Sequence, residues 1–166
     1  MKEQPVFPAV LQRALDESGM KAYGLAANSK VSASTICKIF NYEKYKRRVT
    51  EAQVLRFFVG LVLDESRRRE ILDLLHVKDA VFFNKLDELL ESRKMTCAQL
   101  AIVASVGAER LEEGRSGRRP LQEALKLRLL IEACCKPVEI RDANVLLQAG
   151  DFRILGGGSD DVRRVA

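Results

Sequence analysis

Apolar residues recur at intervals of three and four along almost the whole chain, the spacing that places them on one face of an α-helix. The alternating runs of β-branched and aromatic residues that are typical of strands are missing from the sequence. With 166 residues, 47% of them hydrophobic, the chain is long enough to form one compact domain or two small ones. We therefore expect an all-α fold.

Helix start and stop signals divide the first part of the chain into five helices. Ser32 and Asp64 are residue types that cap helix N-termini, and Thr50 with Gln53 has the spacing of a capping box. Gly19 is expected to end the first helix, because glycine readily adopts the left-handed conformation found there. We predict helices over residues 8–18, over 22–29, after Ser32 with Ile36 and Ile39 facing inward, from Thr50 to Leu61, and from Asp64 to near Leu75.

The same order of residues then repeats at an offset of 75. The matched positions are Leu11 with Leu86, Met20 with Met95, Leu25 with Leu100, Ala26 with Ala101, Val31 with Val106 and Ile36 with Leu111. The register then slips, since RRVT at 47–50 matches RRPL at 118–121, which a loop deletion explains. We expect two units, residues 1–78 and 79–152, followed by a flexible tail over 153–166. The second unit has expected helices near 81–92, 97–104, 107–113, 121–135 and 138–149, with Thr96 and Gln99 as a capping box and Gly150 as a stop.

The string LAANSKVSASTICKIF has the apolar skeleton of a helix-turn-helix. Leu25 and the small Ala26 lie on its first helix, and Val31 fills the space beneath the turn. Ile36 and Ile39 hold its second helix against the first. On these residues the chain resembles the Cro and lambda-repressor-like (XRE) helix-turn-helix family over about residues 10–75.

Residues 86–150 resemble the same family again, through MTCAQLAIVASVGAERL, GRRP and the closing LLQAG. The resemblance implies two tandem lambda-repressor-like five-helix units, each with a helix-turn-helix, and it implies DNA binding. One departure concerns the turn, where the family usually has glycine at positive φ and this chain has Lys30 and Ser105. We expect a strained or differently shaped turn at these two positions.

The resemblance also implies that the exposed face of the third helix enters the major groove of double-stranded DNA. Residues 19–48 carry seven cations against Glu43 alone, a net charge of +6 that exceeds the +5 of the whole chain. The expected base-contacting residues are Ser32, Ala33, Ser34, Cys37, Lys38 and Asn41. Lys21, Tyr42, Lys44, Lys46, Arg47 and Arg48 are expected to contact the sugar-phosphate backbone, the last five from a loop over 41–48. We do not assign Arg67, Arg68 and Arg69 to DNA, because they open a helix expected to lie far from the groove.

The second unit has a different charge pattern. Its expected recognition helix, GAERLEEG, carries Glu109, Glu112 and Glu113 against Arg110, and three carboxylates facing a phosphate groove would be repelled. We therefore expect this unit to serve dimerisation or partner binding. The alternative is a second DNA site, in which Arg115, Arg118 and Arg119 of the following loop compensate the glutamates. The apolar helix near 121–135, with Leu125, Leu129 and Ile131, could supply a dimer face or simply pack in the core.

Composition argues against several other classes of protein. Four cysteines without a CxxC pair and one histidine, His76, lack zinc-ligand spacing, so we expect no metal and no cofactor. Motifs of nucleophilic, metal-dependent or phosphate-binding enzymes are missing, so we expect no catalysis. With neither a signal peptide nor a run of about 20 apolar residues, we expect a cytoplasmic protein that does not enter membranes.

From these observations we expect a sequence-specific transcriptional regulator of bacterial, phage or mobile-element type. It is expected to act as a homodimer on palindromic operators. The alternative is a protein-binding inhibitor or antiactivator that keeps a helix-turn-helix scaffold and docks through its acidic second unit. A third hypothesis is a redox-responsive regulator that uses Cys37 in the groove face.

Overall fold

The computed structural model describes residues 5–156, and all regular secondary structure in that range is helical, which confirms the all-α prediction. None of these helices is long and apolar enough to cross a bilayer. The helices are α1 (Phe7–Ser18), α2 (Ala22–Ser29), α3 (Ala33–Phe40), α4 (Tyr42–Tyr45), α5 (Glu51–Val62), α6 (Glu65–Leu74), α7 (Asp79–Ser92), α8 (Cys97–Ala104), α9 (Ala108–Arg115), α10 (Glu123–Cys134) and α11 (Pro137–Ala149).

The predicted caps set the helix ends. Ser32 Oγ accepts a hydrogen bond from Thr35 N at 3.1 Å, and Asp64 Oδ1 accepts one from Arg67 N at 2.9 Å. Both predicted capping boxes, at the starts of α5 and α8, are formed. Gly19 adopts φ 68°, the left-handed conformation that ends α1. These ends follow from interactions within a few residues, which is why the sequence predicts them well.

Two segments differ from the prediction. Residues 42–45 of the predicted loop form one helical turn, α4, because the Asn41 carbonyl accepts bonds from the amides of residues 44 and 45. Of the predicted tail, Arg153–Leu155 are packed rather than flexible. Leu155 is fully buried, and the Asn144 side chain bonds both its N–H, at 2.7 Å, and its carbonyl, at 2.8 Å. Residues 157–166 of the tail lie outside the described residues.

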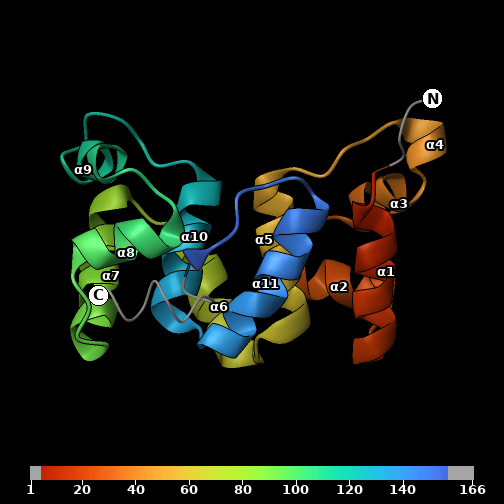
Figure 1. Ribbon diagram of the computed structural model, residues 1–166, viewed down its shortest axis with the longest axis horizontal. Coiled ribbons are helices and arrows are strands. Elements are labelled where there is room, and N and C mark those ends of the chain that lie inside the picture. The colour runs from red at the N-terminus through yellow and green to blue at the C-terminus, as the bar shows by residue number, and fades with distance from the viewer. Residues whose placement is uncertain (1–4, 157–166) are drawn as a thin grey trace.

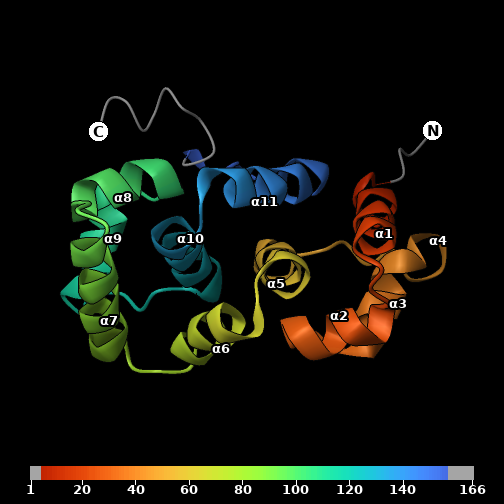
Figure 2. The same cartoon turned by 90° about the horizontal axis from the view of Figure 1, so that it is seen from below.

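Helices α5 and α10 occupy the middle of the molecule, with α6 and α11 beside them (Figures 1 and 2). Helices α1–α4 form one end, and α7–α9 form the other. We call α1–α6 the first half and α7–α11 the second half. Helix α11 packs against α5 and α1, so a helix from the second half of the sequence covers the first part of the molecule. Buried side chains of both halves join in one hydrophobic core.

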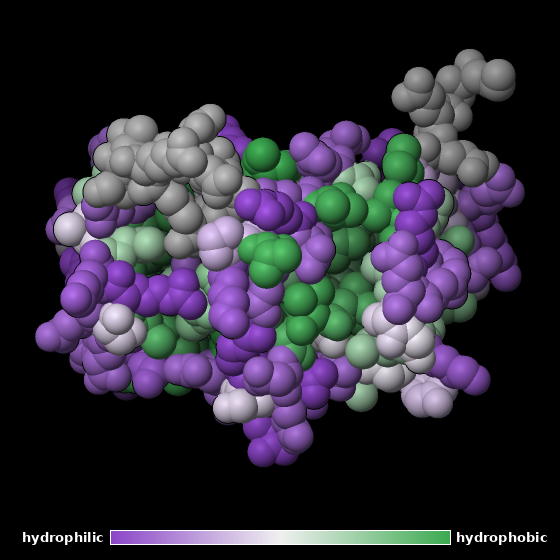
Figure 3. All heavy atoms as spheres, turned by 60° about the horizontal axis from the view of Figure 1, so that its bottom comes forward, coloured by the Kyte–Doolittle hydropathy of each residue, from purple (hydrophilic) through white to green (hydrophobic). Residues whose placement is uncertain are grey.

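Helix α10, the candidate dimer face, lies inside this core. Leu129 and Ile131 have no exposed surface, and Leu125 is partly buried against the core. The helix packs against α5, α6, α7 and α8 of its own chain. Apolar surface is instead visible on the face formed around α11 and α1, and α11 carries the exposed Val138 and Val145 (Figure 3).

The contact between α5 and α10 is reciprocal. Arg56 of α5 pairs with Glu123 of α10, with Nε 3.0 Å from Oε1, and Arg128 of α10 pairs with Glu51 of α5. In each helix the glutamate is the first residue and the arginine follows five positions later. Each helix therefore contributes one glutamate and one arginine at the same two positions, and the arginine of each helix binds the glutamate of the other.

Each arginine also binds the end of a neighbouring helix. Arg56 Nη1 donates to the carbonyl of Ser29, the last residue of α2, at 3.3 Å. Arg128 Nη1 donates to the carbonyl of Ala104, the last residue of α8, at 3.2 Å. The Arg128 side chain is only 3% exposed, so these partners compensate the free energy cost of burying its charge.

A further ion pair joins α6 to α11. Arg67 and Glu139 each occupy the third position of their helix and form two parallel hydrogen bonds, of 2.8 and 2.6 Å. The Arg67 guanidinium lowers the pKa of the Glu139 carboxyl, and bidentate geometry of this kind is the strong form of an ion pair. The two halves are thus held by apolar packing and by three Arg–Glu pairs.

Replacing Arg128 by alanine is expected to lower the free energy of unfolding by about 3 kcal/mol, because it leaves the mostly buried Glu51 carboxylate and a buried carbonyl without their donor. As a control, Arg69→Ala is expected to cost less than about 1 kcal/mol, since the Arg69–Glu65 pair is exposed. Urea unfolding followed by circular dichroism measures both values. Equal losses in the two variants would contradict a structural role for the α5–α10 pairs.

Candidate nucleic-acid interface

Helices α2 and α3 are joined by a tight, well-supported turn. Ser29 is buried, and its hydroxyl donates to the Leu25 carbonyl at 2.7 Å and accepts from Val31 N at 3.3 Å. Helix α5 approaches closely behind it, because a Cβ added at Gly60 would lie 3.0 Å from Ser29 N. Leu25, Val31 and Ile36 are buried as predicted, and so is Ile39. The turn is therefore fixed from the core side.

Lys30 lies in this turn, where we expected a strained or differently shaped backbone. Its φ is 59°, so the backbone takes the left-handed conformation although the residue is not glycine. Ser105 has φ 57° at the corresponding position 75 residues later. The turn is strained rather than reshaped, at a cost of about 1 kcal/mol for each residue.

The outer face of α3 is small and polar, as predicted. Ser32, Ala33, Ser34 and Cys37 are exposed, and Lys38 is half-buried. Ser32 has a structural task as well, since its hydroxyl caps the helix and donates to Thr35 Oγ1 at 2.9 Å. The exposed Ser34 and Cys37 leave room for close approach of another molecule.

Asn41 ends α3 and begins the next element. Its side-chain amide donates to the Cys37 carbonyl at 2.9 Å, which closes the last turn of α3. Asn41 is therefore a capping residue in this structure, and sequence reasoning assigned it only to base contact.

The segment 41–48 gathers cations around two tyrosines. Lys46 Nζ lies 5.3 Å from the centre of the Tyr42 ring, and the Arg48 guanidinium carbon lies 5.9 Å from it. Lys44 Nζ lies 5.2 Å from the Tyr45 ring. Contacts of this kind hold long cationic side chains over an aromatic face while leaving their charge available.

The cations of residues 19–48 have few acidic neighbours. Lys21, Lys44, Lys46, Arg47 and Arg48 are exposed. Glu43 is the one acidic residue of this segment, and outside the segment no carboxylate of residues 5–156 lies within 4 Å of its cations. The end of the molecule that carries α3 and α4 is therefore strongly positive.

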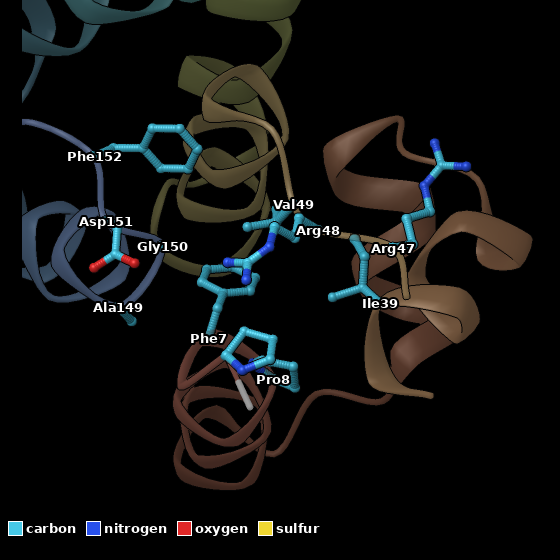
Figure 4. A pocket seen from close by; sticks show the side chains of 11 residues that line it. Phe7, Pro8, Ile39, Arg47, Arg48, Val49, Ala149, Gly150, Asp151 and Phe152 are labelled. Carbon is cyan, nitrogen blue, oxygen red and sulfur yellow. The ribbon is translucent and has the colours of Figure 1, made fainter. Parts of the chain in front are cut away.

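Arg47 and Arg48 point in different directions (Figure 4). The Arg48 side chain enters a cavity of about 240 Å³ whose apolar walls include Phe7, Ile39 and Phe152. The Arg47 guanidinium points away from this cavity. The Arg47 guanidinium is thus more accessible to another molecule than that of Arg48.

The arginine cluster at the start of α6 lies nearer to this end than we expected from the sequence. Arg68 and Arg69 line a hollow of about 170 Å³ together with Lys30 and Asn28. Helix α6 begins beside the α2–α3 turn because it folds back from the end of α5, and sequence spacing does not reveal this. These arginines still lie outside the exposed face of α3.

Helix α9, the counterpart of α3, presents an acidic surface. Glu109 and Glu112 are exposed. Arg110 donates to the carbonyls of Arg119 and Pro120, at 3.3 and 2.5 Å, so its guanidinium is used within the fold.

Arg115, at the end of α9, is also used within the fold. It forms two hydrogen bonds to Asp87, of 3.0 and 2.8 Å, and lies 4.8 Å from the Phe83 ring. The pairing lowers the pKa of Asp87. The Arg115 guanidinium therefore binds a carboxylate of α7 and not the exposed carboxylates of α9.

The cysteines differ in access. Cys37 is exposed on α3, whereas burial raises the pKa of Cys134 to about 11 and that of Cys135 to about 12. A thiol held protonated in this way is a poor nucleophile. Within residues 5–156 no cluster of His, Cys, Asp or Glu is arranged to hold a metal ion.

Comparison of the chain with protein-family models, with curated proteins and with solved structures finds no match.

Alkylation by iodoacetamide at neutral pH is expected to modify Cys37 first and Cys135 last, because Cys37 is exposed while burial keeps Cys135 inaccessible and protonated. Mass spectrometry of tryptic peptides over time measures the order. The Cys37→Ser variant should lose the fastest phase and keep the slow ones. A fast phase from Cys135 would contradict the burial of α10.

Proposed function

We propose that this protein is a sequence-specific DNA-binding transcriptional regulator, and that α3 is the helix that enters the major groove. The observation that carries the proposal is the positive end of the molecule. There the exposed, small and polar face of α3 adjoins cations that pair with no carboxylate outside their own segment among residues 5–156. The phosphates that line the major groove attract a helix with small side chains that is surrounded by such cations.

The proposal gives the exposed residues distinct roles. Lys38 addresses guanine acceptors or a phosphate from the middle of α3, and Ser34 is short enough to let the helix approach base edges. Arg47 and Lys46 contact phosphates beside the groove, with Lys46 steadied over Tyr42. Lys21, which precedes α2, contacts the sugar-phosphate backbone of the DNA on the other side of the turn.

The proposal extends to architecture. We infer that α1–α3, α5 and α6 form one lambda-repressor-like unit and that α7–α11 form a second. Support comes from helices of eight residues in both α2–α3 and α8–α9, and from the left-handed turn residues Lys30 and Ser105. Such a regulator acts by blocking or contacting RNA polymerase at a promoter.

Charge reversal at the proposed interface is expected to weaken DNA binding and its salt dependence. Lys38→Glu and Arg47→Glu should each reduce affinity for the upstream DNA of the gene by about tenfold or more, and each should lower the slope of log K against log salt by about one. Fluorescence anisotropy across a salt series measures both quantities. The matched control is Lys78→Glu, an exposed charge reversal before α7 in the other half, which should change neither.

A different result favours the second candidate function. The exposed Glu112 lines a hollow together with Ala98, Ala101 and Leu111, and Glu109 is exposed on the same helix. This acidic surface suits a basic protein partner. If the wild-type protein shows no preference for upstream over random DNA at any salt concentration, the regulator proposal fails. The inhibitor or antiactivator hypothesis then predicts loss of partner binding on charge reversal at Glu109 and Glu112.

A further inference from the structure

The contact between the two halves has the form of an interface between two identical subunits. In an isologous dimer, residue i of one subunit contacts residue j of the other, and j contacts i. Arg56 with Glu123 and Arg128 with Glu51 follow this rule, and the corresponding residues, Glu51 with Glu123 and Arg56 with Arg128, are 72 residues apart in both cases. A two-fold contact that a homodimer would form between chains is formed here within one chain.

This internal two-fold arrangement sets the positions of two helices. Arg56 binds the end of α2, directly before α3, and Arg128 binds the end of α8, directly before α9. Figure 1 shows α3 with α4 at one end of the long axis and α9 at the other, both in the upper part of the view. A single chain therefore carries one such helix at each end, as a dimer carries one on each subunit.

Only one of these helices is suited to DNA. At the offset of 75, Ser34, Cys37 and Lys38 of α3 correspond to Glu109, Glu112 and Glu113 of α9. Residues 94–119 carry five cations against three carboxylates, a net +2, where residues 19–48 carry +6. Three of those five cations are used within the fold, since Arg110 binds carbonyls, Arg115 binds Asp87, and Arg119 lies 3.9 Å from Glu113.

Resting on the DNA-binding function proposed above, we propose that the target is a single, asymmetric half-site in double-stranded DNA, bound by one chain. Helix α3 reads the half-site, and the carboxylates of α9 keep the other end of the molecule from reading a second one. No second copy is needed to complete the two-fold contact, because α10 is already buried against α5. This proposal replaces the homodimer and the palindromic operator expected from the sequence.

The first test is selection of binding sites from a random DNA library by the full-length protein, with the mass of the selected complex measured by native mass spectrometry. The expected result is one motif without an inverted copy and one chain per DNA. An inverted repeat, or two chains on one site, would overturn this proposal and leave the DNA-binding function standing. Failure to enrich any sequence would overturn the DNA-binding function itself.

The second test transfers the α3 surface to α9. The variant Gly107→Ser, Glu109→Ser, Glu112→Cys and Glu113→Lys gives α9 the residues of Ser32, Ser34, Cys37 and Lys38, and Ala108 already matches Ala33. It should bind an inverted repeat of the motif about tenfold or more tightly than a single half-site, because two linked contacts reinforce each other. No gain from the inverted repeat in a variant whose circular dichroism and thermal unfolding match wild type would contradict the proposed two-fold placement.

A charge-matched control distinguishes sequence-specific DNA recognition from nonspecific electrostatic binding. Glu88→Lys with Glu91→Lys, on the exposed face of α7, raises the net charge by the same four units. This control should raise affinity for all DNA alike and should gain nothing from the inverted repeat. A preference of the control for the inverted repeat would show that charge alone produces the effect.

Discussion

The paired arginines and glutamates between α5 and α10 are the constraint on which the rest of the molecule depends. Each arginine binds a carboxylate of the opposite helix and the last carbonyl of a helix in its own half. The position of α2, and therefore of the turn and α3, is tied through Arg56 to Glu123 in the second half. The close approach of α5 at Gly60 fixes the same turn from below. A change in the contact between the halves would thus move the surface that we propose meets DNA.

Local features of the fold could be predicted from the sequence, and long-range ones could not. Ser32, Asp64 and the two capping boxes act within three or four residues, so their residue types suffice to place helix ends. The burial of Leu155 was missed because it depends on hydrogen bonds to Asn144 and on packing into the hydrophobic core. The role of α10 was left open for the same reason, since an apolar helix has the same sequence whether it packs inside or outside a chain.

The candidate site shows the same division. Its net charge is a sum over residues, which the sequence supplies directly, whereas the availability of each charge depends on partners. Arg115 lies close in sequence to the glutamates of α9, yet it is bound to Asp87, 28 residues earlier. Neighbours in sequence can also diverge, as Arg47 points outward and Arg48 enters a cavity. The sequence therefore predicted a positive surface. Only the fold showed which charged side chains are exposed and which are bound to other groups of the chain.

The packing of α11 against α1 and α5 has a consequence for the order in which the protein is made. Helix α1 is covered by α11, which follows it by more than a hundred residues, so the first half keeps an uncovered apolar face until α11 has been made. Contacts between such distant parts of a chain slow folding and expose intermediates to aggregation. A chain cut short during translation would lack this cover. Helix α5, which supports the turn before α3, is thus fully covered only once α11 has been made.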